Sequence, residues 1–292
     1  MNYSSRFFLY APLGLFLALA VFVGIQWWLA ASALSARLQA MNGREIAPGV
    51  TMRYASRTIS GFPFNLDTVF RDVAFRITTP HGPTEWRSEH FAMHALTYGR
   101  DETIFEAAGR QELHWTRDDG SVSDLVFAVG SLHASAIEDS RGLARFDLDL
   151  MGFGSERLTA QRLQFHIRHG KDDKLYLAVM TDGLRIAPER CPNLDGGIAA
   201  GRLTGTIAAA DAFSSLRAGT QDWSTAIMNW RATGGMFRIE TLSLTPLGGK
   251  SPTDHAQSIL RLHTALEHSP ADKVFALSDM LDAVCGQPAS SY

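Results

Sequence analysis

Residues 7–30 read FFLYAPLGLFLALAVFVGIQWWLA and carry no charged side chain. About 24 residues at about 1.5 Å each make a helix of roughly 36 Å, enough to cross a hydrocarbon core of about 30 Å with some tilt. Trp27 and Trp28 close the run, and tryptophan is enriched where a membrane-spanning helix reaches the interface. The stretch therefore predicts one transmembrane anchor, from which the rest of the chain extends as a water-soluble body.

A cleaved signal sequence is the alternative interpretation of this stretch, because residues 31–33 read ASA, a small-residue cleavage pattern. The apolar region of a secretory signal is usually only about 7–15 residues long, so the length favours a retained anchor. Leu34, Leu38 and Met41 continue with helical spacing as far as Gly43, which predicts a juxtamembrane helix or linker over residues 31–43.

The composition describes a globular body rather than a disordered one, with 46% hydrophobic and 20% charged residues. Roughly 250 of the 292 residues follow the anchor, enough for one large β domain or two smaller ones. The net charge is −3 and basic residues form no run, so nucleic acid is not expected as a partner.

A period-2 alternation of apolar and polar side chains fills the region after the anchor. It is clearest at residues 145–150, where Phe146, Leu148 and Leu150 alternate with charged residues. Closely spaced strands without helical crossovers predict hairpins and a meander, so the expected fold is mainly β with some α: a large curved, mostly antiparallel sheet over residues 44–247. The other expected strands lie at residues 50–59, 65–77, 85–98, 104–116, 122–136, 163–167, 175–179, 198–207 and 237–240.

Helical patterns appear late in the chain. Residues 222–231 place Trp223, Ile227 and Trp230 on one face, with Asp222 ahead of them and glycines at 234 and 235 to end the helix. Further helices are expected within residues 248–292, the C-terminal segment.

Two cysteines, Cys191 and Cys285, lie far apart in the sequence. In an oxidising compartment a disulfide between them would close a loop of about 95 residues, worth roughly 4–5 kcal/mol by chain entropy. Two independent buried thiols are the alternative. The cysteines and the β-rich body favour a single-pass protein with residues 1–6 in the cytoplasm and the main domain outside it.

Three features together resemble the bacterial domain-of-unknown-function family 2125, membrane-anchored envelope proteins found mainly in alphaproteobacteria. They are the single N-terminal anchor, the residues SGFPFNL at 60–66, and the residues WRATGG at 230–235 with the strand-like segment that follows. The resemblance implies an inner-membrane-anchored, β-rich extracytoplasmic domain and transfers no catalytic residue. The layout is also similar, more distantly, to AsmA-type envelope proteins, whose curved sheets hold lipid chains. After Leu247 the chain departs from the family pattern, because helix-like stretches replace a further strand pair.

Pro63 within the GFPF motif restricts Phe62 to an extended backbone and removes one backbone donor, which favours a sheet edge or the start of a strand. Because aromatic pairs usually carry core burial, Phe62 and Phe64 are expected to plug the open end of the sheet rather than to contact a ligand.

Catalytic and metal chemistry have little support in the sequence. His90 and His94 would lie about 13 Å apart on a strand, too far to share one metal ion. Asp147 and Asp149 would lie about 7 Å apart on one strand face, a spacing that a glycosidase could use. Alternating charges on a solvent-facing strand explain the pair without any chemistry, and we favour that interpretation. We expect no cofactor, no metal and no enzymatic activity.

The function expected from these features is binding of a lipid or another apolar envelope ligand in a groove of the curved sheet. A structural or interaction module of an envelope complex is the second hypothesis, and a hydrolase with a site assembled from distant residues is the third. The residues expected to line the groove are Phe62, Phe64, Phe146, Phe165 and Leu177.

Overall fold

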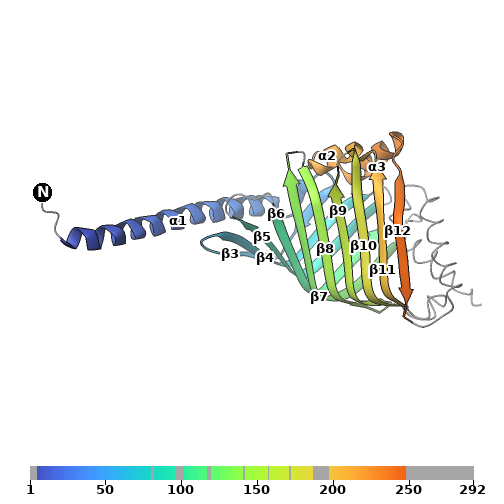
Figure 1. The fold of residues 1–292 in the computed structure, drawn as a ribbon, viewed down its shortest axis with the longest axis horizontal. Helices are drawn as coiled ribbons and strands as arrows, with labels where there is room; N and C mark the ends of the chain where they lie inside the picture. Colours follow the sequence, from blue (N-terminus) through green and yellow to red (C-terminus); the bar gives the residue numbers. More distant parts are fainter. Residues whose placement is uncertain are drawn as a thin grey trace, which may run out of the picture.

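A computed structural model describes residues 5–79, 82–96, 102–116, 120–140, 142–156, 158–170, 172–186 and 197–247. A long helix leads into an antiparallel sheet, and a short helical insert precedes the last strand (Figure 1). The elements are α1 (Ser5–Met41), β1 (Arg44–Ala47), β2 (Val50–Arg53), β3 (Ser56–Ser60), β4 (Asn65–Thr79), β5 (Gly82–Leu96), β6 (Glu102–Thr116), β7 (Val122–Asp139), β8 (Gly142–Ser155), β9 (Leu158–His169), β10 (Lys174–Ile186), β11 (Gly197–Ala208), η2 (Ala210–Phe213), α2 (Ser214–Arg217), α3 (Trp223–Ala232) and β12 (Phe237–Pro246).

The sheet has 12 strands in the order β1-β2-β4-β5-β6-β7-β8-β9-β10-β11-β12, with β3 paired to β4 beside this path. From β4 onward each strand pairs antiparallel with the next in sequence, which confirms the predicted meander and the mainly β fold. Within the described residues the sheet does not close into a barrel. It curls instead, so that the strands of its first half pass behind β8–β11 and cross them obliquely (Figure 1).

The curl has a visible cause in a line of irregular positions across the sheet. Asp72 in β4, Gly109 in β6, Gly152 in β8 and Gly183 in β10 have φ angles of 52°, 75°, 64° and 59°. The pairing of β5 with β6 also shifts register next to Gly109. Because a bulge bends its strand and increases the local twist, irregularities in every second strand from β4 to β10 bend the whole sheet.

The concave face of the curled sheet carries the apolar side chains. Phe91 lies between Phe70 and Phe105, with ring centroids 5.9 Å apart in both pairs. Phe70 is only 1% exposed and Val73 is fully buried, so the core is densest next to the bend at residue 72. These side chains belong to a core that reaches from β2 to β9.

The helical insert between β11 and β12 covers one end of this face. The helix α3 lies where the sequence predicted one, and Asp222 caps it by accepting a hydrogen bond from the backbone N–H of Thr225 at 3.0 Å. Trp230 is 1% exposed, and its Nε1 donates to the carbonyl oxygen of Ala208 at 2.6 Å. The helix also contacts β4 and thereby joins the two halves of the curled sheet.

The helix α1 continues without a break through the predicted juxtamembrane segment and packs on the sheet. Leu38, near its end, is 6% exposed and belongs to the same apolar core as Phe70. The Tyr54 hydroxyl donates to the Leu38 carbonyl oxygen at 3.0 Å, and Arg57 donates to Ser35. The helix α1 is therefore fastened to the sheet by side-chain contacts as well as by chain continuity.

Two predictions lie outside the described residues. Both cysteines, Cys191 and Cys285, fall there, and so do the helices expected in residues 248–292.

Candidate binding face of the sheet

A row of apolar side chains crosses the concave face from strand to strand. Leu148 on β8 faces Phe165 on β9, and Phe165 faces Val179 on β10. Val179 remains 40% exposed, whereas Leu148 and Phe165 are half-buried. We call this set the apolar row, and in register it consists of Met93, Phe105, Ala134, Leu148, Phe165, Val179, Leu203 and Leu242.

The exposure of Val179 is informative because it lies on the face that otherwise forms the core. Leu203, its partner on β11, is only 8% exposed. The apolar row is therefore buried at Leu203 and accessible to solvent at Val179. An apolar face that stays accessible in the middle of a sheet is a surface on which a further apolar group can be buried.

Three of the five residues predicted to line a groove lie on this face. Phe146 and Phe165 are neighbours, with ring centroids 6.3 Å apart, and Leu177 is 8% exposed in the adjoining core. Phe62 and Phe64 lie elsewhere, in the turn between β3 and β4, where they are 59% and 57% exposed. The prediction that these two rings plug the sheet is therefore wrong, because the turn projects beyond the sheet and beside α1.

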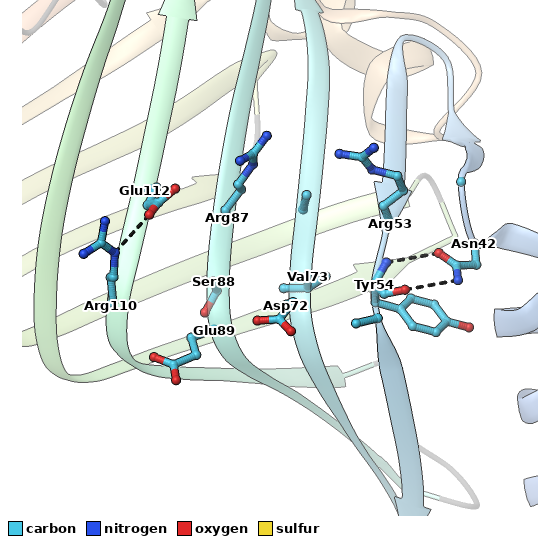
Figure 2. A pocket seen from close by; sticks show the side chains of 13 residues that line it. Asn42, Arg53, Tyr54, Asp72, Val73, Arg87, Ser88, Glu89, Arg110 and Glu112 are labelled. Carbon is cyan, nitrogen blue, oxygen red and sulfur yellow. Dashed lines mark hydrogen bonds and ion pairs between the residues drawn. The ribbon is translucent and has the colours of Figure 1, made fainter.

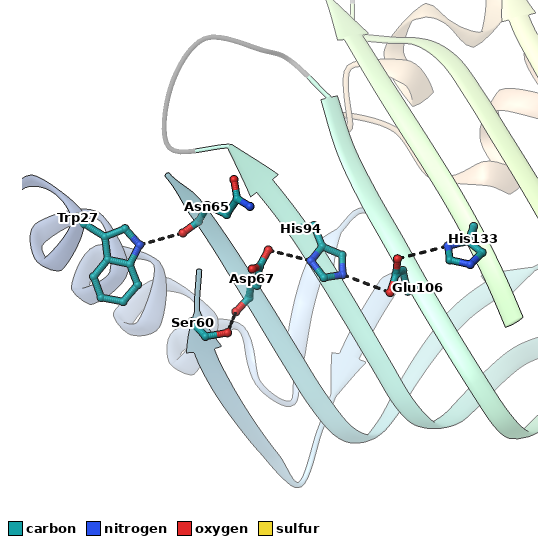
Figure 3. A network of polar contacts seen from close by, with 7 residues as sticks. All are labelled: Trp27, Ser60, Asn65, Asp67, His94, Glu106 and His133. Carbon is teal, nitrogen blue, oxygen red and sulfur yellow. Dashed lines mark hydrogen bonds and ion pairs between the residues drawn. The ribbon is translucent and has the colours of Figure 1, made fainter. Parts of the chain in front are cut away.

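The convex face carries a chain of polar side chains over four neighbouring strands (Figure 3). His94 Nδ1 lies 2.8 Å from Asp67 Oδ1, and His94 Nε2 lies 3.5 Å from Glu106 Oε2. The other oxygen of Glu106 lies 3.3 Å from His133 Nδ1. No local pattern in the sequence predicts this network, since its members are far apart along the chain and meet only through strand register.

Asp147 and Asp149 extend the polar face, as expected for a solvent-facing strand side. Arg162 binds both oxygens of Asp149 at 2.9 and 2.5 Å, and these hydrogen bonds hold the pKa of Asp149 below its usual value. Burial acts to raise the pKa of Asp147, but hydrogen bonds from His166 and Arg145 outweigh it, so that pKa is also lowered.

The convex face does not present a hydrolytic triad around Asp147. Strand register places Ser135 and His166 on opposite sides of this carboxylate. A triad requires the imidazole between the hydroxyl and the carboxylate, whereas here the carboxylate lies between the other two.

A polar depression of about 840 Å³ lies on the convex face near the bend (Figure 2). Figure 2 shows charged side chains of both signs along its lining, with Arg110 paired to Glu112 of the same strand. Arg87 lies 2.5 Å from Glu85, and Arg110 lies 2.9 Å from Glu112. Because charges of both signs alternate here, the depression does not offer the uniform field that selects an anion or a cation.

No group of three or more His, Cys, Asp or Glu side chains that could hold a metal ion occurs in the part of the chain that the structure describes.

A family model described as "Uncharacterized protein conserved in bacteria (DUF2125)" matches residues 27–246. The chain belongs to the DUF2125 family. The matched stretch begins at Trp27, where α1 meets the β3–β4 turn, and ends with β12. No curated protein and no solved structure matches the chain, so the more distant likeness to AsmA-type proteins stays a prediction.

The helix α1, whose last part lies within the DUF2125 region, is long and apolar enough to cross a membrane over Tyr10–Met41. By length and composition it fits a membrane anchor and a signal sequence alike.

Proposed function

We propose that this DUF2125 protein is a membrane-anchored, non-enzymatic binding protein that holds a lipid acyl chain against the concave face of its sheet. Its anchor would cross the bacterial inner membrane with the N-terminus in the cytoplasm and the sheet domain in the periplasm. The single observation that carries the proposal is Val179, 40% exposed in the apolar row.

The chemistry of the row suits an acyl chain better than a polar ligand. Leu148, Phe165 and Val179 are direct cross-strand partners, so their side chains form a continuous strip across the strands. Burying apolar surface is worth about 25 cal/mol per Å², or about 0.8 kcal/mol for each methylene, without any directional contact. A flexible hydrocarbon chain can follow such a strip along the curve of the sheet.

A matched pair of substitutions tests the proposal. Val179→Glu places a carboxylate in the apolar row, whereas Met151→Glu places one at a similarly exposed site on the convex face, where Met151 is 50% exposed. Burial of an unpaired carboxylate against an acyl chain is strongly unfavourable, so we expect Val179→Glu to lower lipid occupancy by at least about tenfold.

The assay is native mass spectrometry of the full chain, purified from a bacterial membrane, with extraction and identification of any retained lipid. Wild type and Met151→Glu should carry lipid at a stoichiometric level, and Val179→Glu should not. Equal occupancy in the two variants would show that the lipid is held elsewhere, for example around α1. A lipid-free wild type would favour the second hypothesis, an interaction module of an envelope complex.

A further inference from the structure

The turn between β3 and β4 presents two large apolar side chains to the surface. Phe62 and Phe64 are 59% and 57% exposed, and Pro63 lies between them. Residues 60–66 carry no charged side chain. Adjacent exposed aromatic rings in an uncharged turn are costly in water and mark a surface that meets an apolar phase.

Two contacts hold this turn against α1. Trp27 Nε1 donates a hydrogen bond to the carbonyl oxygen of Asn65, the first residue of β4, at 2.8 Å (Figure 3). The rings of Trp27 and Phe62 meet edge to face, with centroids 5.6 Å apart. The turn therefore lies at the level of Trp27 along the helix.

The level of Trp27 is where the apolar part of α1 ends. Trp28, next to it, is 63% exposed, and paired tryptophans at the end of an apolar helix are typical of the membrane interface. The other contacts of the body lie further along the helix, at Ser35 and Leu38, about 12–16 Å beyond Trp27. Among these contacts, the turn is the part of the body nearest to the bilayer.

We propose that the β3–β4 turn is a membrane-interface element that places Phe62 and Phe64 at the boundary of headgroups and acyl chains, beside Trp27 and Trp28. Its partner is the leaflet that α1 enters on the side of the body. Aromatic rings favour this boundary because they bury apolar surface without leaving the hydrated zone. Together with the contacts along α1, the turn fixes the orientation of the sheet relative to the membrane.

The placement also bears on the concave face. Leu66, a buried residue at the start of β4, follows Phe64 by two positions, so the apolar side of the sheet begins next to the turn. This proposal rests on one part of the proposed function, namely that α1 is retained in the membrane as an anchor. It does not need the sheet to carry lipid.

The test is photocrosslinking from the turn in proteoliposomes that contain the full chain. The photoreactive residue benzoylphenylalanine replaces Phe64 in one variant and Val122 in the control. Val122 is 73% exposed at the start of β7. Strand register places it near the C-terminal end of β4, whereas the turn precedes the N-terminal end of β4. The 15-residue strand β4 is about 45 Å long, so Val122 lies far from the turn. Thermal denaturation of both variants shows whether each one folds like wild type.

The expected result is a lipid adduct from the Phe64 variant in a yield at least about tenfold above that from the Val122 variant. Equal yields from the two positions, or adducts from position 64 to protein alone, would overturn the proposal. If the Phe64 variant is unstable, benzoylphenylalanine in place of Phe62 provides a second measurement of the lipid adduct yield at the turn. The intact mass of the protein separates the two proposals. Loss of residues 1–33 would show that the anchor is not retained, which would refute both the interface turn and the anchor part of the proposed function. A full-length chain without the lipid adduct would refute only the interface turn.

Discussion

The junction between α1 and the sheet depends on Arg57, so Arg57→Met should loosen it. One guanidinium nitrogen donates to the Ser35 carbonyl oxygen at 2.6 Å and to its hydroxyl at 2.9 Å, and the other donates to the Tyr54 hydroxyl at 2.8 Å. Hydrogen bonds to a charged group are worth about 1.5–3 kcal/mol each, but this guanidinium is only half-buried and stays partly solvated. Methionine keeps the apolar stem, so we expect a total loss of about 2–3 kcal/mol.

This loss should appear as local opening of the helix end rather than as unfolding of the sheet. The corresponding change in hydrogen exchange is roughly 30–150-fold faster opening at residues 31–41. Exchange is measured by mass spectrometry on the full chain in lipid nanodiscs. Arg76→Met is the matched control, because Arg76 is exposed on β4 and takes no part in the hydrogen bonds of Arg57 to Ser35 and Tyr54.

A change of less than about threefold at residues 31–41 in Arg57→Met would refute this reasoning and show that other contacts hold the helix. Equal acceleration in Arg57→Met and Arg76→Met would point to a general loss of positive charge instead.

The remaining predictions concern the stability of the sheet domain. Gly142→Ala should destabilise the fold by more than about 2 kcal/mol in thermal denaturation, because its φ is 96° and a Cβ there would overlap the neighbouring backbone of α2. Gly120→Ala, with a φ of 80° and open space around it, should cost only about 1 kcal/mol; equal losses would contradict the steric argument. Trp230→Phe should cost about 1–3 kcal/mol by the same measurement, because it leaves the carbonyl oxygen of Ala208 without its buried donor, and an unchanged midpoint would count against this. Asp147→Asn should cost no more than about 1 kcal/mol at neutral pH. Because the pKa of Asp147 is lowered in the folded state, its stabilisation is complete above the unfolded pKa near 3.9, and the difference from wild type should disappear as the pH falls through the lower, folded pKa; a difference that persists below both pKa values would exclude this ion pair as its cause.

Local patterns in the sequence were sufficient to predict the strands and the helix of the insert. The alternation at residues 145–150 places Phe146 and Leu148 on one face, and the structure has them on the concave face of β8. The same reasoning failed for Phe62 and Phe64, because an aromatic pair next to a strand gives the same pattern whether it is buried or exposed. The exposure of Val179 could not be predicted from the sequence either, since it depends on which side chains lie opposite it in the folded sheet rather than on its neighbours in sequence.

The sequence by itself determined the long apolar helix, the positions of most strands and their antiparallel order, because each of these depends on the side chains within one short window. Only the tertiary structure decided how far the sheet curls, that Trp27 meets Asn65, and that His94 joins Asp67 to Glu106. The curl is the sum of twist and bulges over many strand pairs, and small changes in each would alter it. Contacts between residues far apart in sequence follow from that sum, so no single window of the chain contains them.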